Sequence, residues 1–248
     1  MPLGSFDQSQ VACNAHALTM LSTSRHRETT KAVGLLLGRT VSIAAIFVIA
    51  GTLEWWNAWV FLAFITVLGW ASSKAIGKSA GLVDERRAAS SKARPWDLVV
   101  VRLLNLALPA MLVLAALNQR FTTLSPVSPT VSGAAFTGMA VAGAVTYHAI
   151  AVNPFFSSYI RVQEDRGHTV VAAGPYRFVR HPGYAGAVMF NLLVPLALGS
   201  WMAMPVGVCA ALLLAYRTAK EDAILSTELP RYAVYAREVP SRLIPWVW

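Results

Sequence analysis

Six runs of apolar residues, separated by polar connections, make up most of the chain. A helix that spans a membrane needs about 20 apolar residues, with about 17 as the practical minimum, and the first four runs reach that length. The last two runs are shorter and meet at Gly199-Ser200, so we expect a tight helical hairpin there. The runs are Gly34–Leu53, Trp55–Ala71, Leu98–Leu117, Val131–Val152, Gly183–Gly199 and Trp201–Tyr216.

The basic residues are distributed unevenly between the connections. Connections rich in Lys and Arg alternate with connections that carry almost none, and of 21 such residues only Arg120 lies on the poorly charged side. Two more, Arg39 and Arg102, fall inside apolar runs. Because Lys and Arg are retained on the cytoplasmic side of a membrane, this alternation predicts six spans with both termini in the cytoplasm. The expected fold class is therefore an all-α polytopic membrane protein.

Three regions follow from this pattern. Residues 1–31 are polar and are expected to be a cytosolic tail, with an amphipathic surface helix as the alternative. Residues 32–152 form a four-helix transmembrane region, and residues 153–248 hold the hairpin and most of the polar motifs. The tail has no apolar segment after a short basic start, so it is not a cleavable signal peptide.

Composition supports a membrane protein and excludes several other classes. Only 13% of the residues are charged, whereas soluble domains carry about a quarter. The net charge of +9 could suggest nucleic acid, but the excess lies in the cytoplasmic connections and no nucleic-acid-binding motif is present. The two cysteines and five histidines show no metal-ligand spacing. We expect no metal, no nucleic acid and no obligate protein partner; the partners are membrane lipids and a lipophilic small molecule or lipid substrate.

The stretch from Gly174 to Gly186 combines turn residues with polar side chains beside an apolar run. Gly174-Pro175 indicates a turn, and Pro182 suits the first position of the fifth helix, where its missing N–H costs nothing. This places His181 at the helix cap and Arg180 just before it. The free N–H groups of the helix start, together with Arg180, are predicted to form an anion site at the membrane face.

A second polar group lies at the end of the sixth run. Arg217 and Glu221 are four residues apart, so they share one helix face, and Asp222 follows directly. A hairpin would bring these residues beside His181. The alternative is an ordinary interfacial salt-bridge cluster. After it, residues 229–245 form an amphipathic segment that we interpret as a lid on the cytosolic face.

Together these motifs resemble the isoprenylcysteine carboxyl methyltransferase family and its bacterial relatives, and more loosely the phospholipid methyltransferases. The shared pattern is Gly-Pro-Tyr-x-x-x-Arg-His-Pro-x-Tyr-x-Gly, then Arg-x-x-x-Glu with a second acid, then Tyr-x-x-Tyr and Arg-Leu-Ile-Pro. It covers about residues 153–248. Two departures are Asp222, where the family usually has Glu, and Arg231, where bacterial relatives often have Gly.

The resemblance implies an S-adenosylmethionine site on the cytosolic side. His181, Tyr184 and Gly186 would contact the cofactor, with Tyr176 and Arg180 in support. Glu221 would hold the cofactor's amino group or ribose, and Arg217 would face the polar head of the substrate. Arg217 and Glu221 are therefore the predicted catalytic pair.

The predicted function is methyl transfer to a lipid-like or isoprenoid acceptor by an integral-membrane enzyme, placed in the bacterial inner membrane. A carboxylate is the preferred acceptor group, because it needs no general base and an Arg such as Arg217 could hold it. An amine or hydroxyl would need a base, for which Glu221 or His181 is the candidate. The alternative is an NADPH-dependent membrane reductase of the sterol-reductase type.

Overall fold

The computed structural model describes residues 40–76, 93–121 and 127–248, without the side chains of 72–76. Residues up to Val48 cluster separately from Ile49–Trp248, so the packing of the helices is that of the second unit. The predicted tail and most of the basic connection after the second run lie outside the described residues. A helix over Thr40–Ala50 falls within the first predicted run.

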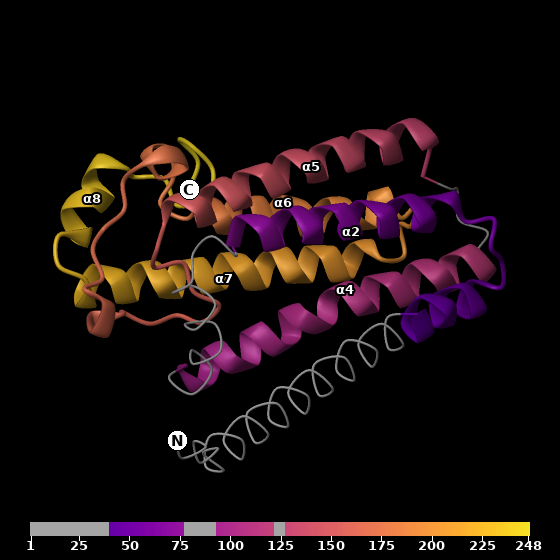
Figure 1. Cartoon of the computed structure of the whole chain (residues 1–248), viewed down its shortest axis with the longest axis horizontal. Coiled ribbons are helices and arrows are strands. Elements are labelled where there is room, and N and C mark those ends of the chain that lie inside the picture. Colours follow the sequence, from indigo (N-terminus) through magenta and orange to yellow (C-terminus); the bar gives the residue numbers. More distant parts are fainter. Residues whose placement is uncertain (1–39, 77–92, 122–126) are drawn as a thin grey trace, which may run out of the picture. The chain divides into compact units, whose positions relative to one another are not determined.

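All regular structure in the described ranges is helical, as the sequence predicts. Between residues 49 and 248 the long helices run side by side, and α8 lies beyond the end of α7 (Figure 1). The elements are α2 (Trp56–Ile76), α4 (Pro95–Phe121), α5 (Pro129–Val152), the 3-10 turns η2 (Glu164–Arg166) and η3 (Gly174–Arg177), α6 (Pro182–Ala197), α7 (Met204–Glu228) and α8 (Tyr232–Glu238).

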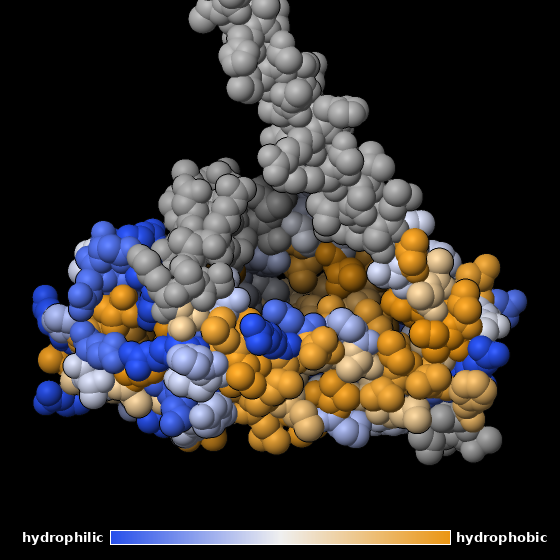
Figure 2. Space-filling model, turned by 90° about the horizontal axis from the view of Figure 1, so that it is seen from below, coloured by the Kyte–Doolittle hydropathy of each residue, from blue (hydrophilic) through white to orange (hydrophobic). Residues whose placement is uncertain are grey.

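Two of the described helices, α4 and α5, are long and apolar enough to cross a membrane, while α6 and Trp56–Ala71 are apolar but shorter. Only 22% of the most apolar 18-residue window of α4 is buried. An apolar surface of that extent suits lipid better than water. On the face seen in Figure 2, hydrophobic side chains cover much of the middle and hydrophilic ones concentrate at the end that carries α8.

Helix α7 is longer than the apolar run that predicts it. The run ends at Tyr216, but the helix continues without a break to Glu228. The added segment contains no Gly or Pro and includes several good helix formers, so nothing in it stops the helix. The polar residues Arg217, Glu221 and Asp222 therefore lie on a rigid helix and not in a loop.

The hairpin of α6 and α7 turns at the predicted place. Gly199 adopts a φ of 76°, a left-handed conformation that glycine tolerates without strain. Side chains from the starts of two other helices secure this turn: Asn57 donates to the carbonyl of Ala197 at 2.8 Å, and Ser132 to that of Leu196 at 2.9 Å. The starts of α2, α5 and α7 thus meet at one end of the unit.

Small residues let α6 approach both of its neighbours closely. A Cβ atom at Gly207 would lie 2.6 Å from the carbonyl oxygen of Asn191, and one at Gly186 would lie 2.6 Å from that of Ala142. Neither backbone can yield easily, so only glycine fits at these two positions. This packing fixes how the polar ends of α5, α6 and α7 meet at the end opposite the hairpin turn.

Candidate active site

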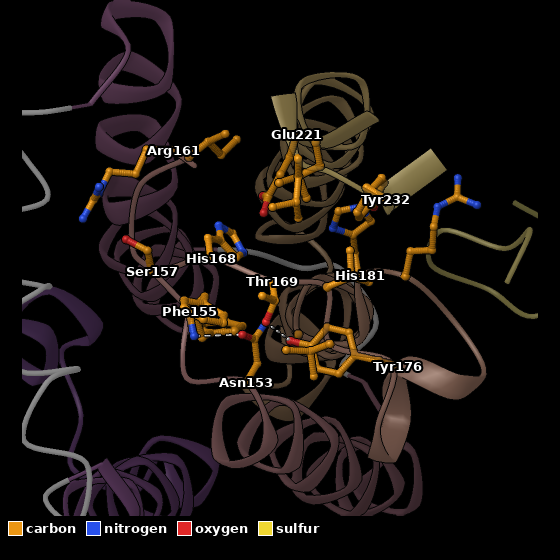
Figure 3. A pocket seen from close by; sticks show the side chains of 18 of the residues that line it. Asn153, Phe155, Ser157, Arg161, His168, Thr169, Tyr176, His181, Glu221 and Tyr232 are labelled. Atoms are coloured by element: carbon orange, nitrogen blue, oxygen red, sulfur yellow. Dashed lines mark hydrogen bonds between the residues drawn. The ribbon is translucent and has the colours of Figure 1, made fainter. Parts of the chain in front are cut away.

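A pocket lies at this polar end, between the segment that links α5 to α6, the start of α6, the later part of α7 and α8 (Figure 3). It contains about 790 Å³ of empty space, part of it open to solvent. Five of the residues predicted for the site line this pocket: Tyr176, Arg180, His181, Tyr184 and Glu221. The other lining residues include Asn153, Phe155, Phe156, Ser157, Tyr159, Ile160, Arg161, His168, Gly183, Leu225 and Tyr232.

The start of α6 is built as the sequence predicts. Pro182 opens the helix and His181 is its N-cap residue. The chain before it is held by the C-terminal segment, because the N–H groups of Arg180 and His181 donate to the carbonyls of Ser241 and Arg242, both at 2.9 Å. The C-terminal segment thereby fixes the backbone on which two predicted site residues stand.

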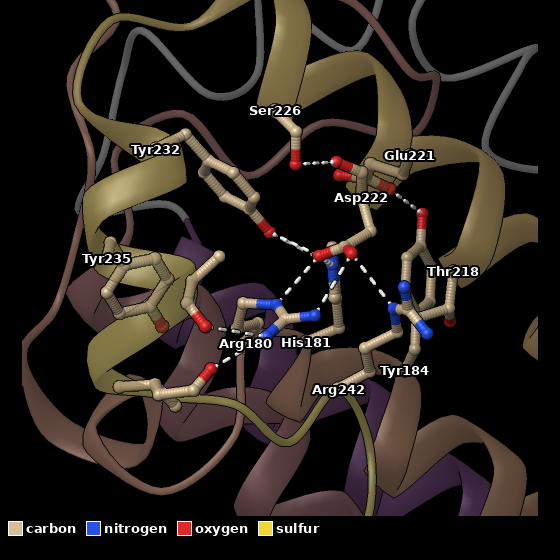
Figure 4. A network of polar contacts seen from close by, with 12 residues as sticks. Arg180, His181, Tyr184, Thr218, Glu221, Asp222, Ser226, Tyr232, Tyr235 and Arg242 are labelled. Carbon is tan, nitrogen blue, oxygen red and sulfur yellow. Dashed lines mark hydrogen bonds and ion pairs between the residues drawn. The ribbon is translucent and has the colours of Figure 1, made fainter.

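Asp222 is the centre of a buried polar network (Figure 4). Its carboxylate accepts from Arg180 Nε at 2.8 Å and Nη2 at 3.0 Å, and from Arg242 Nε at 2.9 Å. The hydroxyl of Tyr232 donates to it at 2.9 Å, and Nε2 of His181 lies 3.3 Å away. These contacts use both carboxylate oxygens and lock α7 to α8, to the start of α6 and to the C-terminal segment.

Two tyrosines of α8 complete the wall beside this network. Burial, reinforced by the negative charge of Asp222, raises the pKa of Tyr232 far above its usual value. Tyr235 is buried next to it, and its hydroxyl donates to the backbone carbonyl of Tyr176 at 2.7 Å. Both hydroxyls therefore act as hydrogen-bond donors and not as bases, and they hold α8 over the pocket.

Glu221 behaves differently from the acid next to it. It lines the pocket, and its Oε2 accepts from the hydroxyl of Tyr184 at 2.6 Å. Successive residues of an α-helix point about 100° apart, so Glu221 faces the pocket while Asp222 faces the ion-pair network. The salt-bridge alternative thus describes Asp222, whereas Glu221 presents a carboxylate to the pocket.

Arg217 is bound to an acid of another helix and does not line the pocket. It is absent from the pocket lining, and its guanidinium binds the carboxylate of Asp97 through Nε at 2.7 Å and Nη2 at 3.1 Å. In this structure the guanidinium faces Asp97, and the expectation that Arg217 faces the substrate's polar head stays a prediction. The sequence pattern could not show this pairing, because Asp97 lies 120 residues away along the chain.

Arg180 lines the pocket, and its guanidinium binds acceptors of the protein itself. Its Nη1 donates to the carbonyls of Val239 at 2.7 Å and Pro240 at 2.8 Å, while the rest of the guanidinium binds Asp222. This guanidinium is already surrounded by acceptors of the protein itself, and the anion site expected at the start of α6 stays a prediction. This placement is compatible with the supporting role that the family resemblance implies for Arg180.

Gly186 lies away from the pocket, against α5. A Cβ there would also collide with Oγ1 of Thr146, which identifies the position as a helix contact. Direct cofactor contact by Gly186, as predicted, does not fit this placement. Gly183 is the glycine that lines the pocket, where a Cβ would lie 2.7 Å from the ring of Phe156.

Tyr176 lines the opposite wall. Asn153 donates to its hydroxyl at 3.0 Å, and this hydroxyl lies 3.4 Å from the carbonyl of Ala149. Burial raises the pKa of Tyr176 to about 12, so the phenol keeps its proton at neutral pH. Asn153 belongs to the Asn-Pro pair that ends α5, and its amide ties that helix end to η3.

The sequence motifs point to no function for His168, although this residue lines the pocket. Its ring packs on Phe155 with centroids 4.5 Å apart, and its Nδ1 accepts from the N–H of Gln163 at 3.3 Å. Burial and the nearby charges of Arg161 and Arg166 lower the pKa of His168 to about 4, so it is neutral at pH 7. The sequence feature that could have pointed to this residue is its place in a short polar loop just before the Gly174–Gly186 stretch.

The arrangement combines one pocket-facing carboxylate, a neutral imidazole and several aromatic side chains around one pocket. The described residues include no group of three or more His, Cys, Asp or Glu side chains placed to hold a metal ion. Such a site can bind and orient a cationic ligand against Glu221.

Residues 136–227 match the model of the isoprenylcysteine carboxyl methyltransferase (ICMT) family. The match begins within α5 and ends one residue before the end of α7, so it contains most of the pocket and both acids. No curated protein sequence matches the chain. The family is one of membrane methyltransferases, and the apolar helices α4 and α5 fit that character. The resemblance drawn from the motifs is therefore confirmed: residues 136–227 match the isoprenylcysteine carboxyl methyltransferase family.

Proposed function

We propose that the chain is an integral-membrane, S-adenosylmethionine-dependent methyltransferase that acts on a lipid-like or isoprenoid acceptor. The observation that carries this proposal is the separation of the two adjacent acids. Asp222 neutralises Arg180 and Arg242, and Glu221 is left to face the pocket. The family match over residues 136–227 contains both acids and the start of α6.

The residues present fit the cofactor. Its sulfonium and ammonium groups are cationic, and Glu221 supplies a carboxylate that lines the pocket and whose Oε2 accepts from the hydroxyl of Tyr184. His181 and Tyr184, whose rings stack with centroids 5.9 Å apart, would form the wall beside it. When bound, the cofactor supplies a methyl group that is already activated on sulfur.

The main tasks of the protein are then to align the cofactor with the acceptor and to exclude water. Holding two reactants in line removes much of the entropic barrier of a two-molecule reaction. The Asp222 network fixes α8 and the start of α6, and Tyr232 and Tyr235 close one side of the pocket. This gives the predicted lid a physical basis, since α8 is tied to the site through buried hydrogen bonds.

The proposal also covers the functional group of the acceptor that receives the methyl group. We take a carboxylate first, because the matched family is named for carboxyl methylation. Arg217 and Arg180 are both paired with acids in this structure, so we propose that neither guanidinium binds that carboxylate. An amine or hydroxyl acceptor would instead use Glu221 as its base.

We further propose six spans, with both termini and the pocket on the cytoplasmic side of a bacterial inner membrane. Residues 32–152 would form the transmembrane region and 153–248 the catalytic region. The meeting of poorly charged helix ends at the hairpin turn, opposite the polar end, supports this orientation. Cysteine labelling of intact cells tests it: positions 120 and 90 should react from opposite sides, and labelling from the same side contradicts the topology.

Retention of tritiated S-adenosylmethionine by the purified protein tests the function directly. We expect Glu221→Ala and His181→Ala to lose binding, whereas Glu228→Ala, on the same helix but outside the pocket lining, should keep it. Tight binding by both site variants would contradict the proposed site. Reduction that depends on NADPH, without cofactor retention, would favour the reductase alternative, which no observation on the described residues supports.

The acceptor is then identified from lipid extracts incubated with enzyme and cofactor that carries a deuterated methyl group. Mass spectrometry detects the labelled product. A methyl ester loses its label in mild base, whereas a methylated amine or an ether keeps it. A base-stable product would replace the carboxylate in the proposal by a group that needs Glu221 as base.

A further inference from the structure

A buried ion pair joins the two halves of the chain behind the pocket. Asp97 lies in the first turn of α4 and is fully buried, and Arg217 on α7 is 7% exposed. The guanidinium meets the carboxylate through two hydrogen bonds of 2.7 and 3.1 Å. Such paired contacts fix direction as well as distance, because the planar guanidinium fork matches the carboxylate.

Each partner also holds the backbone of the pocket wall. The second oxygen of Asp97 accepts from the N–H of Ile160 at 2.8 Å, and Nη2 of Arg217 donates to the carbonyl of Ser158 at 2.8 Å. Ser157, Tyr159 and Ile160 line the pocket. The segment 157–160 has no regular secondary structure of its own, so these two bonds are strong constraints on its path.

The other side of Arg217 faces a residue of the site. Its guanidinium carbon lies 5.3 Å from the centre of the Tyr184 ring, within the range of a cation–π contact. The hydroxyl of that tyrosine donates to Glu221 at 2.6 Å. One ion pair therefore supports both the loop wall and the side chain that orients the pocket's carboxylate.

We propose that Asp97, through Arg217, is a positioning residue of the active site, one that sets the 157–160 wall and the Tyr184–Glu221 contact. This inference rests on the proposed function. It assigns a role in the site to a residue outside the family-matched region 136–227. It also gives Arg217 a positioning role in place of contact with the substrate.

A second ion pair between the neighbourhoods of the same two helices provides a matched control. Arg94, just before α4, binds Glu228 at the end of α7 at 2.6 Å, and these side chains are 39% and 43% exposed. Neither residue lines the pocket or bonds to segment 157–160 among the described contacts. If an ion pair matters only because it joins α4 to α7, Arg94→Gln should change activity and the pocket wall in the same way as Asp97→Asn.

The test uses Asp97→Asn, the double variant Asp97→Asn/Arg217→Gln, and Arg94→Gln in the full-length protein. Asp97→Asn leaves a buried guanidinium uncompensated and can impair folding, whereas the double variant removes both charges. We expect the double variant to fold and still to lose about 10- to 100-fold in kcat/KM, because small misplacements of aligned groups have effects of that size. Arg94→Gln should stay within about twofold of the wild type.

Two readouts separate positioning from simple stability. Activity and cofactor affinity are measured per folded molecule, well below each unfolding midpoint, where a purely structural role would leave both unchanged. Hydrogen exchange of the peptide that covers 157–161 needs no ligand, and it should rise in the Asp97 variants and not in Arg94→Gln. The Ile160 amide reports directly, because Asp97 is its acceptor.

The outcomes are distinct. Folded Asp97 variants with wild-type kcat/KM, wild-type cofactor affinity and unchanged exchange over 157–161 would overturn the inference. A wild-type protein that retains no S-adenosylmethionine would instead contradict the proposed function, and the exchange measurement would still decide whether Asp97 sets the wall.

Discussion

The two adjacent acids of α7 should respond in opposite ways to the same chemical change. Asp222→Asn removes the charge shared by Arg180 and Arg242 but keeps the size of the side chain. Removing one partner of a buried ion pair costs about 3–5 kcal/mol. The Arg180 pair, 6% exposed on both sides, falls in that range, whereas Arg242 is 34% exposed and adds little.

The expected loss of unfolding free energy can be measured as a fall in the melting temperature. For a chain of this size each kcal/mol lowers the midpoint by about 2–4 °C, so Asp222→Asn should lower it by about 6–20 °C. Glu221→Gln is the matched control: it disturbs one hydrogen bond, from Tyr184, and should cost less than about 1.5 kcal/mol. Thermal unfolding of the detergent-purified variants, followed by circular dichroism, measures both.

Cofactor binding should be weakened more by Glu221→Gln than by Asp222→Asn, which is the reverse of the order expected for stability. A hydrogen bond to a charged group contributes about 1.5–3 kcal/mol, so Glu221→Gln should weaken S-adenosylmethionine binding about 10- to 150-fold. Asp222→Asn, measured well below its midpoint, should be affected less than Glu221→Gln. Equal midpoints for the two variants, or weaker binding by Asp222→Asn than by Glu221→Gln, would refute the division of roles.

Three further expectations follow from the structure. Gly186→Ala should destabilise the protein by about 1–3 kcal/mol, because the added Cβ would press on the backbone of α5. Gly133→Ala, where a Cβ would meet open space, is the control. A selective loss of cofactor affinity in Gly186→Ala would instead support direct contact between Gly186 and the cofactor. Tyr184→Phe should weaken cofactor binding with little change in midpoint, since it frees Glu221 to rotate; unchanged affinity in a binding titration would contradict this. Burial, Arg161 and Arg166 lower the pKa of His168 from 6.5 to about 4, so the unfolded state binds more protons between these values and stability should fall as pH drops from about 6.5 to 4; His168→Gln should remove this part of the pH dependence in thermal unfolding.

Part of the site follows from local sequence. Pro182 can open a helix but not continue one easily, so the start of α6 and the cap at His181 were predictable from neighbouring residues. Gly199 marks the hairpin turn for a similar reason, since its left-handed conformation favours glycine. The hairpin then places the end of α7 beside His181 by chain connectivity alone.

The roles of individual side chains do not follow in this way. Glu221 and Asp222 are neighbours in sequence, and which of them faces the pocket depends on the rotation of α7, which is set by its packing against α6 at Gly207. Arg217 has its partner in a helix 120 residues earlier, and no spacing rule reaches that far. Arg180 points to Asp222 and to carbonyls near the C-terminus for the same reason.

The sequence by itself determined the order of the apolar helices, the hairpin and the motif that carries the family resemblance. These depend on hydropathy, on turn residues and on charge placement, which act over a few residues at a time. Only the tertiary structure decided that Glu221 faces the pocket, that Asp222 ties it together and that Asp97 supports it from behind. Those assignments depend on helix rotation and on contacts between distant segments, which packing of the whole unit fixes and local pattern does not.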